Sequence, residues 1–462
     1  MPGIIAHYNV TDRFINEAGN KERLERQRAI DAYWKYYDGD HIHWLDVVPG
    51  KRDDNMVINL SGRAVDKMAE FVGTPKAIQL PSQTNAATGA SAKPDSAQLQ
   101  LNTWWETYAK LMPEIVQSGL VSGHTFLKLF LNSDEQAAFT LLEPGYVTVF
   151  WDALNTKQNL FYRMEWLQGN LRYRQDIVPD WLLEVPMGGV MTVAPVAQSW
   201  KIFDYRSWGQ GWRLMAEQDW EHPFAPIVDW PFKKRAHSYY GVSMLSGGRA
   251  GLNDFVNFSA SNIGRILKFH AQPDTFVFGA ILDDKKSIGG YWDDLPVEAR
   301  VETVELKSDL VSSMNFMNFL KSEFFSSTRV LDTSTVKDKL GQITNFGVRM
   351  LFDEMIESWE EITGLCGDGL GETFWRMLQV NGIETDAKPK AIWKDPLPTN
   401  RLEKLQEAQI EEALNTTSAK TIASDIGRNY EAEQAQRADE GQSNGRLLGS
   451  ILQLGATRGT LA

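Results

Sequence analysis

Cysteine is almost absent from this 462-residue sequence, which contains only Cys366. An intramolecular disulfide framework is therefore excluded, and the composition fits a reducing compartment. Long apolar runs are also missing, because the longest stretch, residues 187–197, is interrupted by glycines and a proline. We expect no membrane span. The first residues, MPGIIAHYNVTDRF, lack the basic, apolar and small-residue order of a signal peptide, so none is expected.

Common catalytic motifs are missing as well. The sequence has no G-x-x-x-x-G-K-[ST] phosphate loop, no H-E-x-x-H, no paired C-x-x-C and no G-x-S-x-G. Gly367, Gly369 and Gly371 alternate, but they follow a predicted helix and do not join a strand to a helix, which argues against a dinucleotide site. We therefore predict a protein that is not an enzyme and that needs no cofactor and no metal.

Positive charge is scarce, because 47 basic residues face 60 acidic ones and the net charge is −13. Proteins that grip DNA by neutralising its phosphates are normally basic. If this chain meets DNA, it should do so without holding it tightly. One stretch has no basic residue and seven acids, namely Asp353, Glu354, Glu357, Glu360, Glu361, Asp368 and Glu372. A solvated helix face and an acidic wall that repels phosphate both remain open.

Three other patterns suggest sites. Sixteen tryptophans could stack on sugars or bases, although cores and subunit interfaces use such side chains more often. The basic triplet 233–235 could touch phosphate, but a solvated loop or an inter-subunit ion pair is favoured. A metal site is conceivable where acids and histidines cluster, but the spacing matches no calcium loop and a turn after a helix also collects such residues: Asp38, Asp40, His41, His43 and Asp46.

The first half of the chain predicts helices followed by strands. Apolar stripes indicate helices over residues 20–37, 60–72 and 97–119, with a kink or break at Pro113. Residues 82–97 are small and polar and predict either a mobile loop within a domain or a linker. From His124 to Pro231 the pattern is β, with short aromatic and β-branched runs separated by turn residues at 126–131, 146–150 and 160–164. This part should form an α+β domain with a meander-like sheet.

The central segment has a distinctive order of elements. A helix over 244–269 is followed by strands at 275–278 and 299–306, and then by a helix over 314–326. Two helices that bracket a small β unit make a rod, and a rod buries one face poorly in a monomer. Such a rod makes sense as one stave of a ring.

Helices also dominate the rest of the chain. After a polar loop, a third helix is expected over 344–363, with Gly364 just beyond its end. Asn400 and Glu403 form a capping box for a helix that reaches Leu414, and another helix should end at Gly427.

Several short stretches, in this order, resemble the portal proteins of tailed double-stranded DNA bacteriophages. Each stretch is weakly specific alone, and the order carries the resemblance. The third helix departs from many relatives, because Leu340-Gly341-Gln342 stands where they have Ser-Gly ahead of Ala-Leu. The matching stretches are Tyr36-Tyr37-Asp38-Gly39-Asp40, Asn59-Leu60, Val65-Asp66-Lys67, Pro226-Ile227-Val228-Asp229, Tyr240-Gly241-Val242-Ser243, Asp395-Pro-Leu-Pro398, Thr417-Ser418, Glu431 and Glu433.

The resemblance implies a portal fold, which assembles as a ring, usually of twelve subunits, around an axial channel at one capsid vertex. It also implies the following division: 1–240 wing, 241–270 stem helix, 271–312 β-rich clip, 313–327 second stem helix, 328–343 tunnel loop, 344–395 wing helix and following segment, and 396–462 helical crown and C-terminal tail. Double-stranded DNA would pass the channel during packaging and ejection.

Partners and site residues follow from the same resemblance. The partners would be other copies of the chain, DNA in transit bound weakly and without sequence preference, the terminase large subunit, a head-completion or adaptor protein, and the major capsid and scaffold proteins. The protein would reside in the virion, and in the host cytoplasm during assembly. The tunnel loop and its flanks would present Lys337, Lys339, Thr333 and Thr335 to DNA. The clip would dock partners through Asp283, Asp284, Lys285, Lys286 and Trp292.

Two rival functions remain. One is another virion structural protein, such as a minor head component. The other is a carbohydrate-active enzyme or binding module that uses the tryptophans. A glycosidase needs two carboxylates at a fixed separation in a cleft, and the sequence singles out no such pair.

Overall fold

The chain divides into two compact units in the computed structural model. The first contains the chain up to Gly341 together with Met350–Pro396, and the second contains Gln342–Arg349 and Leu397–Ala462. The residues that the structure describes are 17–47, 49, 53–81, 96–151, 159–184, 196–207, 209, 211–271, 275–279, 298, 300–303, 310–332, 345–385, 387–397, 410 and 434. The predicted loop at 82–97 therefore lies outside them except for Ser96 and Ala97, which are helical, and the predicted helices beyond 400 fall almost wholly outside them.

The N-terminal helices lie where the apolar stripes predicted them. They are α2 (Glu17–Asp38), α3 (Leu60–Val72), α4 (Ser96–Tyr108) and α5 (Met112–Ser122). Asn59 caps α3, because its side chain accepts a hydrogen bond from the Gly62 amide. The predicted break at Pro113 is confirmed: a short 3₁₀ turn, Ala109–Leu111, precedes α5, and the proline occupies the first turn of α5, where its missing N–H costs nothing.

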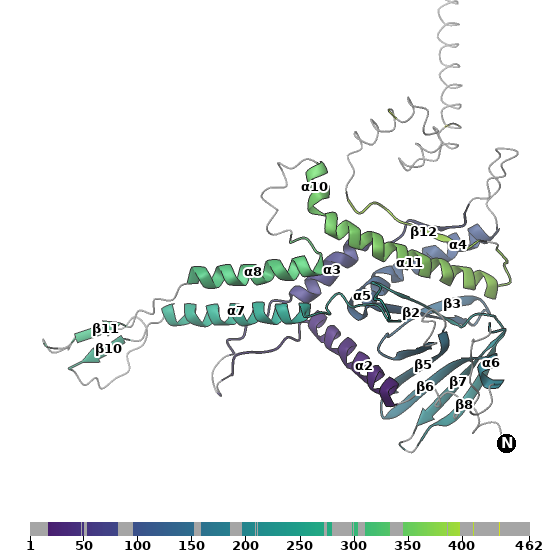
Figure 1. The fold of residues 1–462 in the computed structure, drawn as a ribbon, viewed down its shortest axis with the longest axis horizontal. Coiled ribbons are helices and arrows are strands. Elements are labelled where there is room, and N and C mark those ends of the chain that lie inside the picture. Colours follow the sequence, from purple (N-terminus) through teal and green to yellow (C-terminus); the bar gives the residue numbers. More distant parts are fainter. Residues whose placement is uncertain are drawn as a thin grey trace, which may run out of the picture. The chain divides into compact units, whose positions relative to one another are not determined.

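Two antiparallel sheets follow (Figure 1). The larger is a meander whose five strands are neighbours in chain order, as predicted: β4 (Val147–Trp151), β5 (Asn159–Gln168), β6 (Leu171–Pro179), β7 (Trp200–Ser207) and β8 (Arg213–Trp220). The smaller has the order β3 (Ala137–Leu142), β2 (His124–Leu131), β9 (Ile227–Pro231). A short helix, α6 (Asp180–Glu184), follows β6, and β1 (Ala77–Gln79) pairs with β12 (Lys390–Ile392). The α+β class is confirmed.

Two long helices flank a β hairpin in the central segment. They are α7 (Arg249–Ala271) and α8 (Leu310–Thr328), and between them β10 (Thr275–Phe278) pairs antiparallel with β11 (Arg300–Thr303). The predicted start of the first helix at 244 is wrong. Gly247 and Gly248 have φ angles of +70° and +86°, which are incompatible with a right-handed helix, so α7 begins only after them.

The third predicted helix is longer than expected and interrupted. It comprises α10 (Asn345–Leu351) and α11 (Asp353–Val380), so its predicted end at Gly364 is wrong. Two glycines beyond this point lie inside α11, where other parts of the chain pack closely against the helix. A Cβ on Gly369 would lie 2.2 Å from the Trp230 ring, and one on Gly371 would lie 2.3 Å from the Pro389 carbonyl oxygen.

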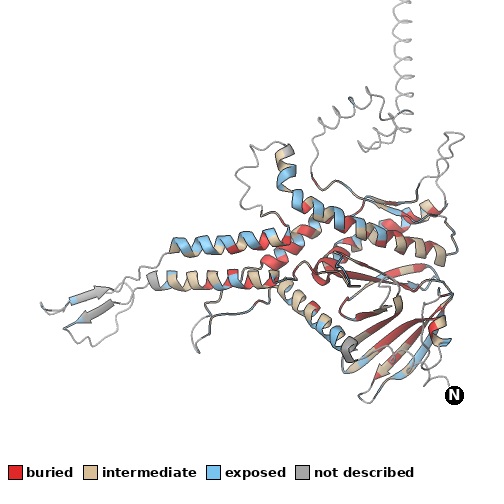
Figure 2. Ribbon diagram, viewed as in Figure 1, coloured by how far each residue is buried: buried red, intermediate tan, exposed pale blue. Residues whose placement is uncertain are grey.

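The main core lies between α3, α5, α11 and the three-stranded sheet, where the ribbon is coloured red in Figure 2. Arg376 of α11 fastens this contact, because its Nη1 donates to the carbonyls of Ala225 and Ile227, both at 2.7 Å. Cys366 is fully buried there, and burial raises the pKa of its thiol to about 12. None of the helices in the described ranges is both long and apolar enough to cross a membrane.

Candidate assembly surface

The helices α7 and α8 lie side by side, and we call this pair the helical rod (Figure 1). The sequence of α8, LVSSMNFMNFLKSEFFSST, places apolar residues all round the helix. A helix of this kind normally belongs in the interior of a protein. Only Leu320, Phe324, Phe325 and Thr328, near its C-terminal end, are buried. In Figure 2 much of α8 is coloured as exposed.

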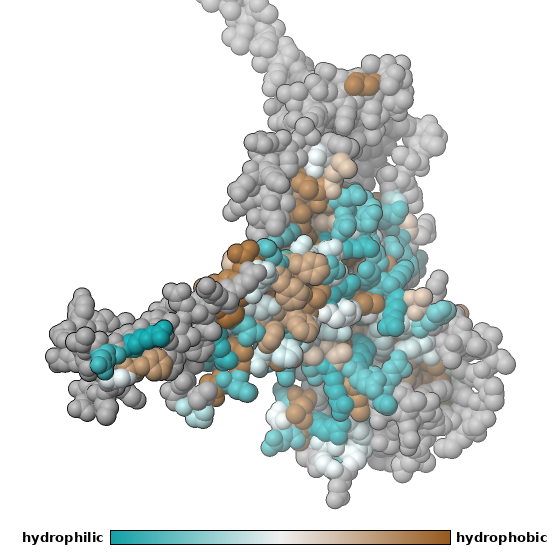
Figure 3. Space-filling model, turned by 60° about the vertical axis from the view of Figure 1, so that its left-hand side comes forward, coloured by the Kyte–Doolittle hydropathy of each residue, from teal (hydrophilic) through white to brown (hydrophobic). Residues whose placement is uncertain are grey.

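Large apolar side chains therefore remain in contact with water on both helices of the rod. On α8 the exposed fractions are 68% for Val311, 50% for Met314, 55% for Phe316 and 60% for Phe319. On α7 they are 51% for Phe255, 38% for Phe258 and 50% for Leu267. Figure 3 shows that hydrophobic side chains reach the surface in several patches. Apolar patches of this kind mark protein–protein interfaces in soluble proteins.

One such patch is aromatic. The Trp44 ring stacks on Phe255 with ring centroids 6.0 Å apart, and it meets Phe258 edge-on at 5.8 Å. Trp44 itself is 44% exposed. An exposed tryptophan that contacts two exposed phenylalanines is a typical anchor of an interface, where aromatic side chains are enriched.

A different edge of α7 carries polar side chains that hold residues 54–61, which we call the strap: an extended segment and the first two residues of α3. The Asn253 carboxamide oxygen accepts from the amides of Leu60 and Ser61, both at 2.9 Å, and its nitrogen donates to the Ile58 carbonyl at 2.7 Å. One turn later, Asn257 Oδ1 accepts from the Ile58 amide at 2.9 Å. These side chains provide hydrogen-bond partners for backbone groups of the strap, which has no partner strand at these residues.

The contact continues along the helix at three- and four-residue steps. Ser261 Oγ accepts from the Met56 amide at 2.9 Å, and Lys268 Nζ pairs with Asp54 at 2.8 Å. Gly264 lies beneath the Met56 sulfur, which would be 3.1 Å from an added Cβ. Sequence reasoning missed this feature. The available signal was the run of Asn253, Asn257, Ser261, Gly264 and Lys268 on one helix face.

The acid and histidine cluster after α2 is used for tertiary contacts. His41 is buried, and its Nδ1 lies 3.2 Å from Asp254 Oδ1 on α7. Tyr36 OH donates to Asp254 Oδ2 at 2.7 Å. The pKa of the Tyr36 hydroxyl is raised to about 12 by burial and by this carboxylate. Among the described residues, no group of three potential ligands is placed to hold a metal ion.

A second buried carboxylate, Asp229 on β9, accepts hydrogen bonds from three rings. His124 Nε2 lies 2.9 Å from it, Tyr162 OH donates at 3.0 Å, and Tyr239 OH donates as well. His124 Nδ1 accepts from the Gly241 amide at 3.3 Å, which puts the ring proton on Nε2. The guanidinium of the half-buried Arg26 lies 3.7 Å from the Tyr240 ring centroid beside this group.

Many tryptophans serve the core. Trp104, Trp105, Trp200, Trp220 and Trp230 are at most 8% exposed. Buried indoles cannot present a stacking platform to a sugar. The structure therefore favours the packing interpretation for these five residues.

The acidic stretch on α11 lies mostly at the surface. Asp353, Glu354, Glu357, Glu360, Glu361 and Asp368 are exposed. Glu372 is half-buried and differs from them, because Arg376 and Lys388 both bind it. Burial alone would raise the pKa of Glu372, but these two cations outweigh it and lower that pKa.

The residues that the sequence assigned to DNA and to partner docking cannot be placed. Thr333, Thr335, Lys337 and Lys339 lie outside the described residues, as do Asp283, Asp284, Lys285, Lys286 and Trp292. In the basic triplet, Lys234 and Arg235 are exposed, whereas Lys233 is half-buried and lines a cavity. The described part of the site is therefore the exposed apolar surface of the rod.

No protein-family model and no curated protein matches this chain. The chain is similar to a protein in the neck of an empty GTA particle computed with C6 symmetry, at 13% identity and a TM-score of 0.45. That match covers 82% of this chain and 95% of the other. It is also similar to a protein in the neck of a native GTA particle computed with C12 symmetry. There the identity is 14%, the TM-score is 0.42, and the match covers 80% and 89% of the two chains.

Proposed function

We propose that this chain is a portal protein, which closes into a ring at one capsid vertex and forms the channel for double-stranded DNA. The observation that carries the proposal is the exposed apolar surface of the helical rod. Four large apolar side chains of α8 are at least half exposed in the isolated chain. Each square ångström of apolar surface removed from water stabilises an assembly by roughly 25 cal/mol, so neighbours that cover these side chains are favoured.

A ring explains why both α7 and α8 expose apolar side chains. The exposed residues of α7 and α8 differ from each other, so one copy can place its α8 against the α7 face of the next. Such head-to-tail contacts generate a closed ring when the rotation between copies closes. The usual number in the family that the sequence resembles is twelve, which we adopt for this chain.

The charge balance supports a channel through which DNA slides. Duplex DNA carries one charge per about 1.7 Å of its axis, so a strongly basic wall would hold it at many points. This chain has a net charge of −13 and an exposed acidic face on α11. We propose that Lys337 and Lys339, with Thr333 and Thr335, make the weak contacts to DNA.

The remaining roles also belong to this proposal. Residues 271–312 would dock the terminase large subunit during packaging and the adaptor afterwards, through Asp283, Asp284, Lys285, Lys286 and Trp292. The ring would contact major capsid and scaffold proteins and stay in the virion. We propose no catalytic activity for the chain, because force for packaging would come from the separate terminase.

The decisive experiment is the mass of the purified chain by mass photometry. Twelve chains of 52.2 kDa would weigh about 626 kDa. We expect the double variant Phe316→Glu, Phe319→Glu to remain a monomer, because two carboxylates would be buried unpaired in the interface.

The matched control is Leu99→Glu with Leu167→Glu. These leucines are 62% and 65% exposed but lie on α4 and β5, away from the rod. The control should form the same ring as the unmodified chain. A rod variant that still assembles to the full mass would refute the proposed interface, and an unmodified chain that stays monomeric with its virion partners present would refute the ring.

A further inference from the structure

A small cavity lies where the rod joins the rest of the first unit. Its volume is about 60 Å³, and its walls come from α3, α5, the segment after β9, the start of α7, the end of α8, and α11. Met68, Leu120 and Phe232 contribute apolar side chains to its lining. Because several separate elements form its walls, the shape of the cavity depends on the tertiary fold and not on one flexible loop.

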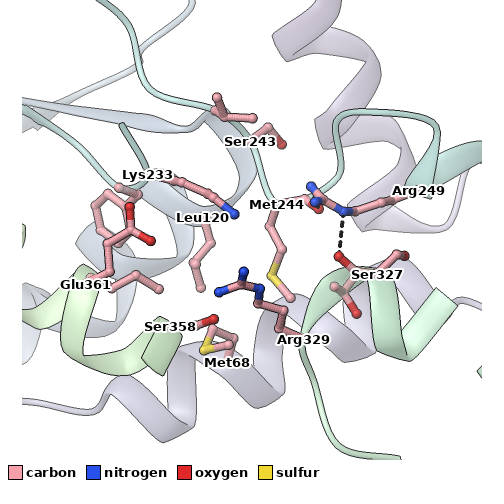
Figure 4. A pocket seen from close by; sticks show the side chains of 14 residues that line it. Met68, Leu120, Lys233, Ser243, Met244, Arg249, Ser327, Arg329, Ser358 and Glu361 are labelled. Atoms are coloured by element: carbon pink, nitrogen blue, oxygen red, sulfur yellow. Dashed lines mark hydrogen bonds between the residues drawn. The ribbon is translucent and has the colours of Figure 1, made fainter. Parts of the chain in front are cut away.

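Three cationic side chains line this cavity: Lys233, Arg249 and Arg329. Figure 4 shows the Lys233 ammonium and the Arg329 guanidinium pointing into it from opposite sides. Arg249 is held at its edge, because Nε donates to the Ser327 carbonyl at 2.8 Å and Nη1 to the Met244 carbonyl at 3.3 Å. Its Nη2 forms no hydrogen bond with the described residues.

The backbone fixes one of these cations in an unfavourable conformation. Arg329 has a φ angle of +56°, a region that residues other than glycine seldom adopt. The turn is held by hydrogen bonds from the Arg329 amide to the Ser326 carbonyl and from the Val330 amide to the Phe325 carbonyl, both at 3.0 Å. These two bonds are the usual C-terminal cap of a helix, and they fix where Arg329 leaves the end of α8.

The local charge is not balanced. Glu361 also lines the cavity, and Glu357 lies 3.8 Å from Arg329, but the members of that pair are 64% and 44% exposed, so their attraction is weak. The pKa of the Arg249 guanidinium is lowered, first by burial and then by the charge of Arg329. Both effects disfavour the charged form of Arg249, whereas the charge of an anion in the cavity would favour it.

We propose that this cavity binds one phosphate-type oxyanion through Lys233, Arg249 and Arg329. Arginine presents a planar fork of donors that suits phosphate oxygens, and lysine adds a point charge. A cavity volume near 60 Å³ is enough for a single small oxyanion, because about 10–15 Å³ of such volume already holds one water molecule. The inference does not rest on the ring.

The test is calorimetric titration of inorganic phosphate into the full chain, with potassium chloride used to hold the ionic strength constant. We expect one phosphate per chain. Lys233→Gln and Arg329→Gln should each weaken binding by about tenfold or more, because each removes a charged donor. The matched control is Lys234→Gln, which removes the adjacent, exposed charge and should leave the affinity unchanged.

Circular dichroism of each variant verifies its folding. No heat of binding in the unmodified chain would overturn the proposal, and so would equal affinities for Lys233→Gln and Lys234→Gln. A short DNA duplex distinguishes the two sources of phosphate. If the site takes the free ion, duplex will not displace inorganic phosphate. If it takes a backbone phosphate, the two will compete in the unmodified chain and not in Lys233→Gln.

Discussion

Asp229 shows how single residues hold the interior of this protein together. Its carboxylate has 8% of its side-chain surface exposed, and His124, Tyr162 and Tyr239 all contact it. A buried carboxylate is tolerated only when hydrogen bonds replace its lost hydration. Here the donors come from β2, from β5 and from the segment after β9, so one residue fixes the smaller sheet against the larger.

This arrangement predicts a pH dependence of stability. Burial lowers the pKa of the His124 imidazole below its ordinary value of about 6.5, although Asp229 opposes the shift. Below that value the unfolded chain binds a proton that the folded chain does not, so stability falls as the pH decreases. The slope should approach about 1.4 kcal/mol per pH unit until the native histidine itself is protonated.

Urea unfolding between about pH 5.5 and 7.5 measures this slope, because ordinary carboxylates are ionised throughout that range. His124→Gln keeps a donor for Asp229 but cannot titrate there, so its stability should vary less with pH. The pKa of His222 is also lowered by burial, and its contribution persists in both proteins. Identical slopes in the two proteins would exclude His124 as the source.

At the scale of elements, the polar edge of α7 makes the strap part of the fold. Asn253→Ala would remove the partners of the buried Leu60 and Ser61 amides. Each buried group left unsatisfied costs about 1–3 kcal/mol, so we expect a loss of roughly 2–4 kcal/mol. The measurement is the urea midpoint, which should fall while the slope of the transition stays the same.

Ser259→Ala is the control on the same helix. Ser259 Oγ donates only to the Phe255 carbonyl one turn earlier, at 2.9 Å, in an exposed position. Its removal should change stability by less than about 0.5 kcal/mol. Equal effects of the two substitutions would mean that the hydrogen bonds from Asn253 to the strap add no measurable stability.

The elements that the sequence predicted best are those with local signals. α3 begins and ends at the predicted residues, because Asn59 caps one end and Gly73 follows the other. The prediction failed at glycines whose role is tertiary. Gly369 and Gly371 lie inside α11 because Trp230 and Pro389 pack against them, and nothing in the local sequence reveals those partners.

The candidate surfaces likewise include one that local sequence patterns predict and two that they do not. An apolar rod could be inferred from periodicity, and its exposed side chains agree with that inference. The strap and the cationic cavity could not, because Asn253 lies 193 residues from Leu60, and Lys233 lies 96 positions before Arg329. Contacts of that sequence separation have no local signature in a single sequence.

At the scale of the whole molecule, the proposed channel leads to a prediction about transport. Lys337→Glu combined with Lys339→Glu should leave the ring intact but impair DNA packaging or retention, because the few weak contacts to phosphate would become repulsive. The measurements are ring mass and packaged genome length. Lys234→Glu with Arg235→Glu makes the same change in charge elsewhere and should package normally. Normal packaging by the Lys337, Lys339 variant would remove those residues from the channel.

The strap also sets the order of events during synthesis. Its partners on α7 follow it by 192 to 214 residues, which a ribosome adds in about 10 to 40 s at about 5 to 20 residues per second. Residues 54–61 must wait unpaired for that time. The helix that completes the strap also carries part of the exposed apolar surface of the rod, and α8 carries the rest, so a nascent chain cannot present this surface to a neighbour until most of it has been made. Copies should therefore associate only after each subunit has folded, so the exposed apolar surface does not cause premature association during synthesis.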